Sequence, residues 1–87
     1  MTWSDEATEI VKELLHELPA PERAGVQEAA HARAESLTSD EGEEEVAMET
    51  AVRAFVESTP EDLRNRLRRA LTYHGIDPED YAESFDA

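Results

Sequence analysis

Apolar residues recur every three or four positions over most of the chain, with charged residues between them. Side chains with this spacing share one face of an α-helix, so the pattern predicts a series of amphipathic helices. The first helix is expected over residues 5–18, with Ser4 as its N-cap and Pro19 as its end. Its apolar stripe consists of Trp3, Ala7, Ile10, Val11, Leu14, Leu15 and Leu18.

The same period predicts two further main helices. The second is expected over residues 21–37 and opens with Pro21, because the missing N–H of proline is not needed at the first position of a helix. Alanine dominates the stripe of this helix, so a neighbouring helix can approach it closely. The third is expected over residues 46–58, after an acidic connection at residues 38–45 whose Thr, Ser and Asp offer N-caps.

A threonine, a proline and two acidic residues mark the clearest helix start in the chain. Thr59 is expected to cap a fourth helix that Pro60 opens, while Asp62 reaches back as in a capping box. Gly75 suits the C-cap of this helix, because glycine adopts the left-handed conformation found there. Asp77 and the proline after it repeat the cap-and-proline pattern, which predicts a short C-terminal helix.

No segment alternates apolar and polar residues in the manner typical of a strand, so no strand is expected. The predicted fold is all-α, a small helical bundle of three main helices plus a fourth helix and a short C-terminal helix. With 87 residues the chain has material for one hydrophobic core, which predicts a single domain over residues 1–87. The expected core contains Ile10, Val11, Leu14, Leu15, Leu18, Val26, Ala30, Val52, Phe55, Leu63, Leu67 and Leu71.

The chain is strongly acidic, with 22 Asp and Glu against 8 Lys and Arg and a net charge of −14. This charge repels nucleic acid and anionic membranes, and no apolar run approaches the roughly 20 residues that a membrane span needs. The N-terminus lacks the features of a secretion signal, so a cytoplasmic location is expected. The acidity and the single lysine, Lys12, favour a halophilic host, in which salt screens the self-repulsion. The alternative is an acidic protein that binds a basic surface.

Two features are candidates for partner binding. Residues 60–74 hold four arginines against two acids, whereas residues 1–59 hold fifteen acids against four basic residues. The arginines either form a partner site or pair with the acidic helices and offset the helix dipole. Trp3, at the entrance to the first helix, either anchors a partner or packs in the core. The four arginines are Arg64, Arg66, Arg68 and Arg69.

Residues that carry catalytic chemistry are sparse. The chain has no cysteine, which excludes disulfides, thiolate metal sites and cysteine nucleophiles. His16, His31 and His74 lack the spacing of a helical metal site, and no nucleophile elbow or phosphate-binding glycine loop occurs. We therefore expect no catalytic residue, no metal site and no cofactor, and a binding role rather than an enzymatic one.

The N-terminal two thirds of the chain carry a recognisable order of residues. A tryptophan and an alanine open the first helix, a proline and an arginine join it to an alanine-rich second helix, and a threonine turn precedes a Val/Ala helix. This order, over residues 2–56, resembles the small helical C-terminal domain found in light-independent protochlorophyllide reductase. That domain also occurs as short stand-alone proteins. The matching positions are Trp3, Ala7, Pro19, Arg23, Val26, Ala30, Thr38 and Val46.

The resemblance implies a non-catalytic accessory domain. In the full enzyme the large subunits bind the iron–sulfur cluster and the pigment, and the small domain packs near the substrate pocket. The expected partner is therefore a protein, with a larger redox subunit as the candidate, while residues 59–87 are helices additional to the resemblance. The alternative function is an acidic regulatory or decoy protein that binds a basic partner surface.

Overall fold

Five α-helices account for most of the structure, a computed structural model that describes residues 1–86. Two 3₁₀ turns, η1 (Glu61–Leu63) and η2 (Pro78–Tyr81), precede the last two helices, and two short strands, β1 (Thr2–Trp3) and β2 (Glu45–Val46), precede the first and the third. This order confirms the predicted all-α fold. The α-helices are α1 (Asp5–His16), α2 (Ala20–Asp40), α3 (Met48–Ser58), α4 (Arg64–Tyr73) and α5 (Ala82–Phe85).

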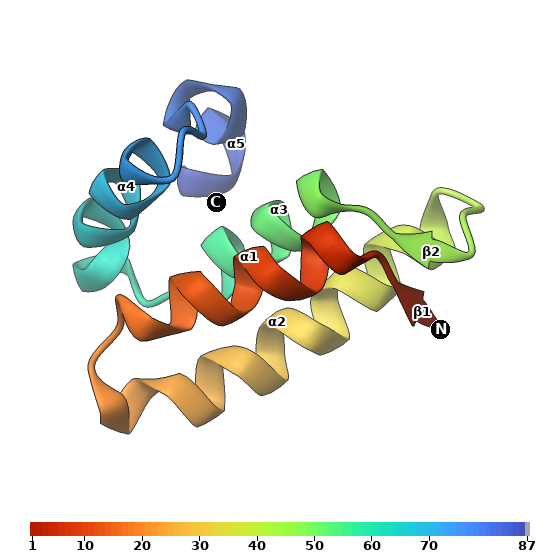
Figure 1. The fold of residues 1–87 in the computed structure, drawn as a ribbon, viewed down its shortest axis with the longest axis horizontal. Coiled ribbons are helices and arrows are strands. Elements are labelled where there is room, and N and C mark those ends of the chain that lie inside the picture. The colour runs from red at the N-terminus through yellow and green to blue at the C-terminus, as the bar shows by residue number, and fades with distance from the viewer. Residues whose placement is uncertain (87) are drawn as a thin grey trace.

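The helices pack as a three-helix layer with the last two helices at one end. α1 and α2 lie side by side as a helical hairpin, and α3 packs against both (Figure 1). At one end of this layer α4 contacts α1 and α5 contacts α3, while the two strands lie at the other end (Figure 1). One side of α4 therefore faces protein and the other faces solvent.

Side chains close both ends of α1. The Ser4 hydroxyl accepts a hydrogen bond from the Ala7 amide at 3.0 Å, which confirms Ser4 as the N-cap. At the other end, the Arg23 guanidinium donates from Nε to the Leu18 carbonyl at 3.0 Å and from Nη2 to the His16 carbonyl at 3.3 Å. Arg23 thus satisfies carbonyls that the end of a helix leaves without an intrahelical partner.

α2 runs further than the sequence predicts. The expected end near Leu37 is wrong, because the polar residues after it continue the helix to Asp40 instead of capping the next one. Gly42 then adopts a positive φ of 74°, and the Glu43 amide donates back to the Thr38 carbonyl at 3.0 Å. This is a Schellman C-cap, which glycine favours because it has no Cβ to strain the left-handed conformation.

Two short strands contradict the expectation that the chain has none. β1 and β2 pair in parallel, Thr2 with Glu45 and Trp3 with Val46, and the Ser4 amide donates to the Val46 carbonyl at 3.0 Å. Val46 is fully buried in β2 and not in α3, where the sequence placed it. Two residues per strand are too few to show an alternating pattern, so periodicity has no means of detecting them.

The start of the C-terminal region differs from the predicted capping box. Thr59 is buried, and its hydroxyl donates at 2.7 Å to the Phe55 carbonyl in α3 instead of capping the next helix. The two other caps predicted in this region are confirmed. Gly75 has a φ of 78° and ends α4 with an Ile76-to-Leu71 backbone bond of 2.8 Å, and the Asp77 carboxylate accepts from the Glu79 amide at 3.0 Å.

One hydrophobic core joins all five helices. Of the twelve predicted core residues, eleven are buried, and the exception is Leu63, which is only partly buried at the edge. Tyr81 and Phe85, near the end of the described residues, are also buried in this core. None of the helices described, over residues 1–86, is both long and apolar enough for a bilayer crossing.

Candidate functional site

The four arginines of α4 form two rows on opposite sides of the helix. At 3.6 residues per turn, positions 64 and 68 lie about 40° apart, and positions 66 and 69 lie about 60° apart on the far side. Arg64 and Arg68 are half-buried, whereas Arg66 and Arg69 are exposed. We call the first pair the inner row and the second pair the outer row.

The inner row holds the end of the chain against α4. Arg64 donates from Nη1 to the Phe85 carbonyl at 2.8 Å and from Nε to the Thr59 carbonyl at 3.2 Å. The Arg68 guanidinium lies over the Phe85 ring, with its Cζ 4.1 Å from the ring centroid, in cation–π geometry. These two arginines therefore have an internal, stabilising role.

The outer row has no such internal role. Within residues 1–86, no hydrogen bond or ion pair engages Arg66 or Arg69. Tyr73 continues this side of α4 one turn further on, and 83 % of its surface is exposed. Together with Glu17 of the α1–α2 turn and Ala70, these residues line a shallow hollow of about 420 Å³. The exposed face of α4 is thus two unengaged guanidinium groups and a phenol ring.

The sequence predicted the arginine cluster, but neither its division into two rows nor the place of Tyr73 beside the outer row was predicted. Among the aromatic side chains, three are buried in the core and Trp3 is partly buried against it, whereas Tyr73 is exposed. The helical period alone could have placed Tyr73 on the exposed side of this helix. Position 73 lies outside the buried stripe of Leu67 and Leu71 and one turn beyond Arg69.

Trp3 is held by the protein itself. Its indole ring stacks on His31, with the ring centroids 4.2 Å apart and 25° between the planes. Its Nε1 donates to the Glu35 carboxylate at 3.0 Å. Both partners lie on α2, so the indole ties β1 to that helix. The exposed part of Trp3 forms one wall of a groove of about 450 Å³ between α1 and α2, which Val11 and Lys12 also line.

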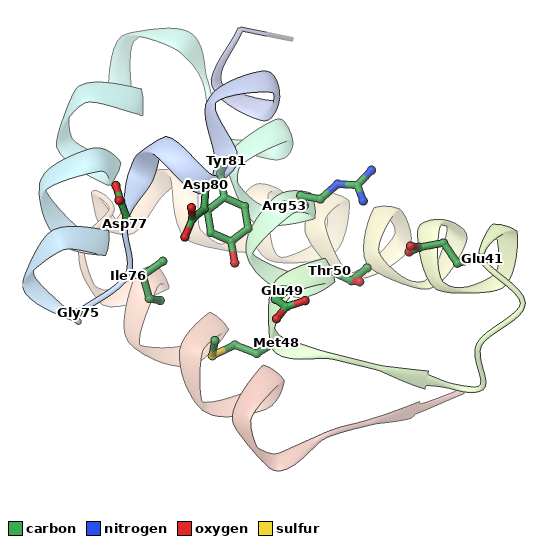
Figure 2. Close-up of a pocket in the computed structure, with 10 residues that line it drawn as sticks. All are labelled: Glu41, Met48, Glu49, Thr50, Arg53, Gly75, Ile76, Asp77, Asp80 and Tyr81. Carbon is green, nitrogen blue, oxygen red and sulfur yellow. The ribbon is translucent and has the colours of Figure 1, made fainter.

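A second groove, of about 540 Å³, is acidic and lies between α3 and the segment before α5. Figure 2 shows Tyr81 above it, beside Asp80, with its hydroxyl directed toward Glu49. Burial raises the pKa of the Tyr81 hydroxyl, and the negative charges of Glu49 and then Asp80 raise it further. Glu41, Asp77 and Arg53 complete the charged lining.

His74 lies where α1 meets α4, a contact that the sequence did not indicate. Its Nδ1 is 3.0 Å from a carboxylate oxygen of Glu13, and its Nε2 is buried without a hydrogen-bond partner. The other two histidines lie elsewhere. In the described part of the chain, no group of three or more His, Asp and Glu side chains is arranged to hold a metal ion.

Comparison of the chain with protein-family models, with curated proteins and with solved structures found no match. The likeness to the reductase domain therefore stays a prediction.

Proposed function

We propose that this protein is a non-catalytic accessory module that binds a larger protein partner through the exposed face of α4. The observation that carries this proposal is the division of the arginines. Arg64 and Arg68 contact Phe85, while Arg66 and Arg69 are exposed beside Tyr73 and have no side-chain partner among residues 1–86.

The composition of this face suits a protein interface. Tyrosine and arginine are enriched at interfaces, and they dominate the residues whose truncation costs the most binding energy. Two neighbouring guanidinium groups in an otherwise acidic protein also produce a local positive field, which steers an acidic partner surface toward α4. At low salt such steering orients the partner, while at any salt burial of the Tyr73 ring contributes affinity that salt does not screen.

The resemblance supplies the candidate partner, a larger redox subunit, and the acidic composition supplies the proposed setting, the cytoplasm of a halophile. Near 1 M salt the Debye length is about 3 Å, so only charges in direct contact still attract each other. Under those conditions an interface made of direct arginine and tyrosine contacts persists. Long-range attraction of basic proteins to the acidic surface of this chain disappears.

The test is a capture experiment with the full chain on native cell extract, in low and in molar potassium chloride. The test variant is R66Q/R69Q, and the matched control is K12Q/R53Q, which makes the same charge change away from α4. We expect the wild-type chain and the control to retain a redox subunit at molar salt, and the R66Q/R69Q variant to lose it. Equal retention by both variants would exclude the α4 face.

A second candidate function follows from the acidic groove in Figure 2. Four carboxylates from Glu41, Glu49, Asp77 and Asp80 line it, with Arg53 as the only basic residue among its lining. We propose, as the alternative, a regulatory or decoy role in which this groove binds a basic partner surface. A basic protein that is captured at low salt, is released at molar salt and is lost with E49Q/D80N would support this alternative. Retention at molar salt would contradict it.

A further inference from the structure

We infer that the partner of the outer row presents an acidic segment that carries an aromatic side chain. This inference rests on the proposed function, because it names the chemistry of the partner that docks on α4. It derives from the opposite side of the same helix, where the protein already binds such a segment.

The segment in question is residues 77–86 of this chain, which we call the terminal segment. It contains five acidic residues and no basic residue, and its two aromatic residues are Tyr81 and Phe85. Both aromatic side chains are buried, Tyr81 with 8 % and Phe85 with 5 % of its surface exposed. The terminal segment is therefore an acidic, aromatic peptide that packs on α3 and on the arginine-bearing helix α4.

The inner row holds this peptide by two different contacts. The Arg64 guanidinium donates a hydrogen bond to the Phe85 backbone carbonyl, and the Arg68 guanidinium lies over the Phe85 ring. The two arginines are spaced one turn apart on α4, so a single aromatic residue of the ligand meets both. The first contact fixes the backbone of the ligand and the second selects an aromatic side chain.

The outer row offers the same groups on the far side of α4. Arg66 and Arg69 are again about one turn apart, and Tyr73 adds a ring against which an aromatic side chain can pack. Residues 64–73 contain four arginines and no acidic residue, so this face attracts acidic groups. Glu17 borders the hollow. A ligand therefore has to place its acidic groups toward the arginines and away from that side.

The occupant that we propose is a segment of another protein. The terminal segment of the same chain is already seated, with Phe85 held by Arg64 and Arg68 on the inner side of α4. A second copy would have to release its own segment first, which would expose two buried aromatic side chains. Release and exchange of the segment is instead one of the outcomes that the following experiment detects.

The probe is a synthetic peptide with the sequence of residues 77–86, added to the isotopically labelled full chain and followed by NMR. The matched peptide carries alanine at both aromatic positions, which leaves its charge unchanged. We expect the amide signals of Arg66, Arg69 and Tyr73 to shift, and the alanine peptide to bind at least tenfold more weakly. The R66Q/R69Q variant should lose these shifts, while K12Q, which changes a charge away from α4, should keep them.

Three results would overturn the inference. Equal affinity of the two peptides would remove the aromatic requirement, and an absence of shifts at millimolar peptide would remove the ligand class. Shifts confined to α5 and the inner row would show exchange of the terminal segment instead. The proposed function fails separately, because capture of a redox subunit that depends on Arg66 and Arg69 would still support it even if every peptide result were negative.

Discussion

The two sides of α4 carry the same residue type in two different environments. On the inner side, Arg64 and Arg68 contact the backbone and the ring of Phe85 and are half-buried. On the outer side, Arg66 and Arg69 are exposed and have no partner within the described residues. Both pairs are about one turn apart, so spacing alone does not distinguish them.

This difference teaches that position relative to the buried stripe of a helix decides the role of an arginine. The inner row lies next to Leu67 and Leu71, so its side chains lie along the protein surface and meet the terminal segment. The outer row lies opposite this stripe and meets solvent. Substitutions in the inner row are therefore expected to change stability, and substitutions in the outer row to change binding.

The largest effect is expected for Phe85→Ala, which removes the side chain that the inner row grips. Phe85 has only 5 % of its surface exposed, and truncation of a buried phenylalanine costs about 3 kcal/mol or more. Urea denaturation measures the loss, and faster hydrogen exchange in α5 than in α3 would show that the terminal segment detaches first. Tyr73→Ala is the control, because an exposed side chain contributes little. A loss below about 1 kcal/mol for Phe85→Ala would contradict the proposed grip.

Arg64→Ala comes next, because it removes the hydrogen bonds that this charged donor makes to the Phe85 and Thr59 backbone carbonyls. Hydrogen bonds that involve a charged group contribute about 1.5–3 kcal/mol each when the partner is buried, and partial exposure of Arg64 places the expected loss near the lower value. Arg69→Ala makes the same change on the same helix and serves as the control. Equal stabilities of the two variants would erase the distinction between the rows.

The sequence predicted the arginine cluster but not its division. The local charge balance, which can be counted directly in the sequence, located the cluster of Arg64, Arg66, Arg68 and Arg69. The division depends on where the terminal segment lies, and that placement follows from tertiary packing of Phe85. Trp3 shows the same limit. Its residue type made it a candidate, but its stacking on α2 comes from a contact with His31, which is distant in the sequence.

The fold was more accessible than the site. Helical periodicity predicted α1 and the buried stripes of α3 and α4, because an amphipathic helix carries an apolar residue on its buried face every three to four positions. The errors lie where one local signal competes with another. Thr59 is a good N-cap by type, yet its hydroxyl donates to Phe55 at the end of the preceding helix. Likewise, Gly42 and not the residues before it ends α2.

A third prediction concerns pH and the other aromatic residue of the terminal segment. Burial, with the charges of Glu49 and Asp80, raises the pKa of Tyr81 above that of an unfolded tyrosine, which is about 10. Folding therefore favours the neutral phenol. This stability is fully present below about pH 10 and is lost as the pH rises from there through the raised value.

The measurement is the urea midpoint between about pH 8 and about pH 11, for the wild-type chain and for Tyr81→Phe. The wild-type midpoint should fall more steeply above about pH 10 than that of the variant, because only the wild type has to bury an ionising group at this position. Tyr73→Phe should leave the wild-type slope unchanged. Parallel curves for the wild type and Tyr81→Phe would show that the terminal segment does not bury the phenol.

The smallest effect on stability is expected in the outer row. Each of Arg66→Ala and Arg69→Ala should change the free energy of unfolding by about 0.5 kcal/mol or less, because neither guanidinium has a partner to lose in the part of the chain that the structure describes. The double variant makes the acidic chain still more negative. Salt screens this self-repulsion, so added salt should stabilise the double variant as it stabilises the wild type. A loss as large as that of Arg64→Ala would mean that the outer row holds the fold together, and the exposed face of α4 would then no longer be available to a partner. A neutral result combined with lost partner capture would instead separate the two rows completely, with stability on one side of the helix and recognition on the other.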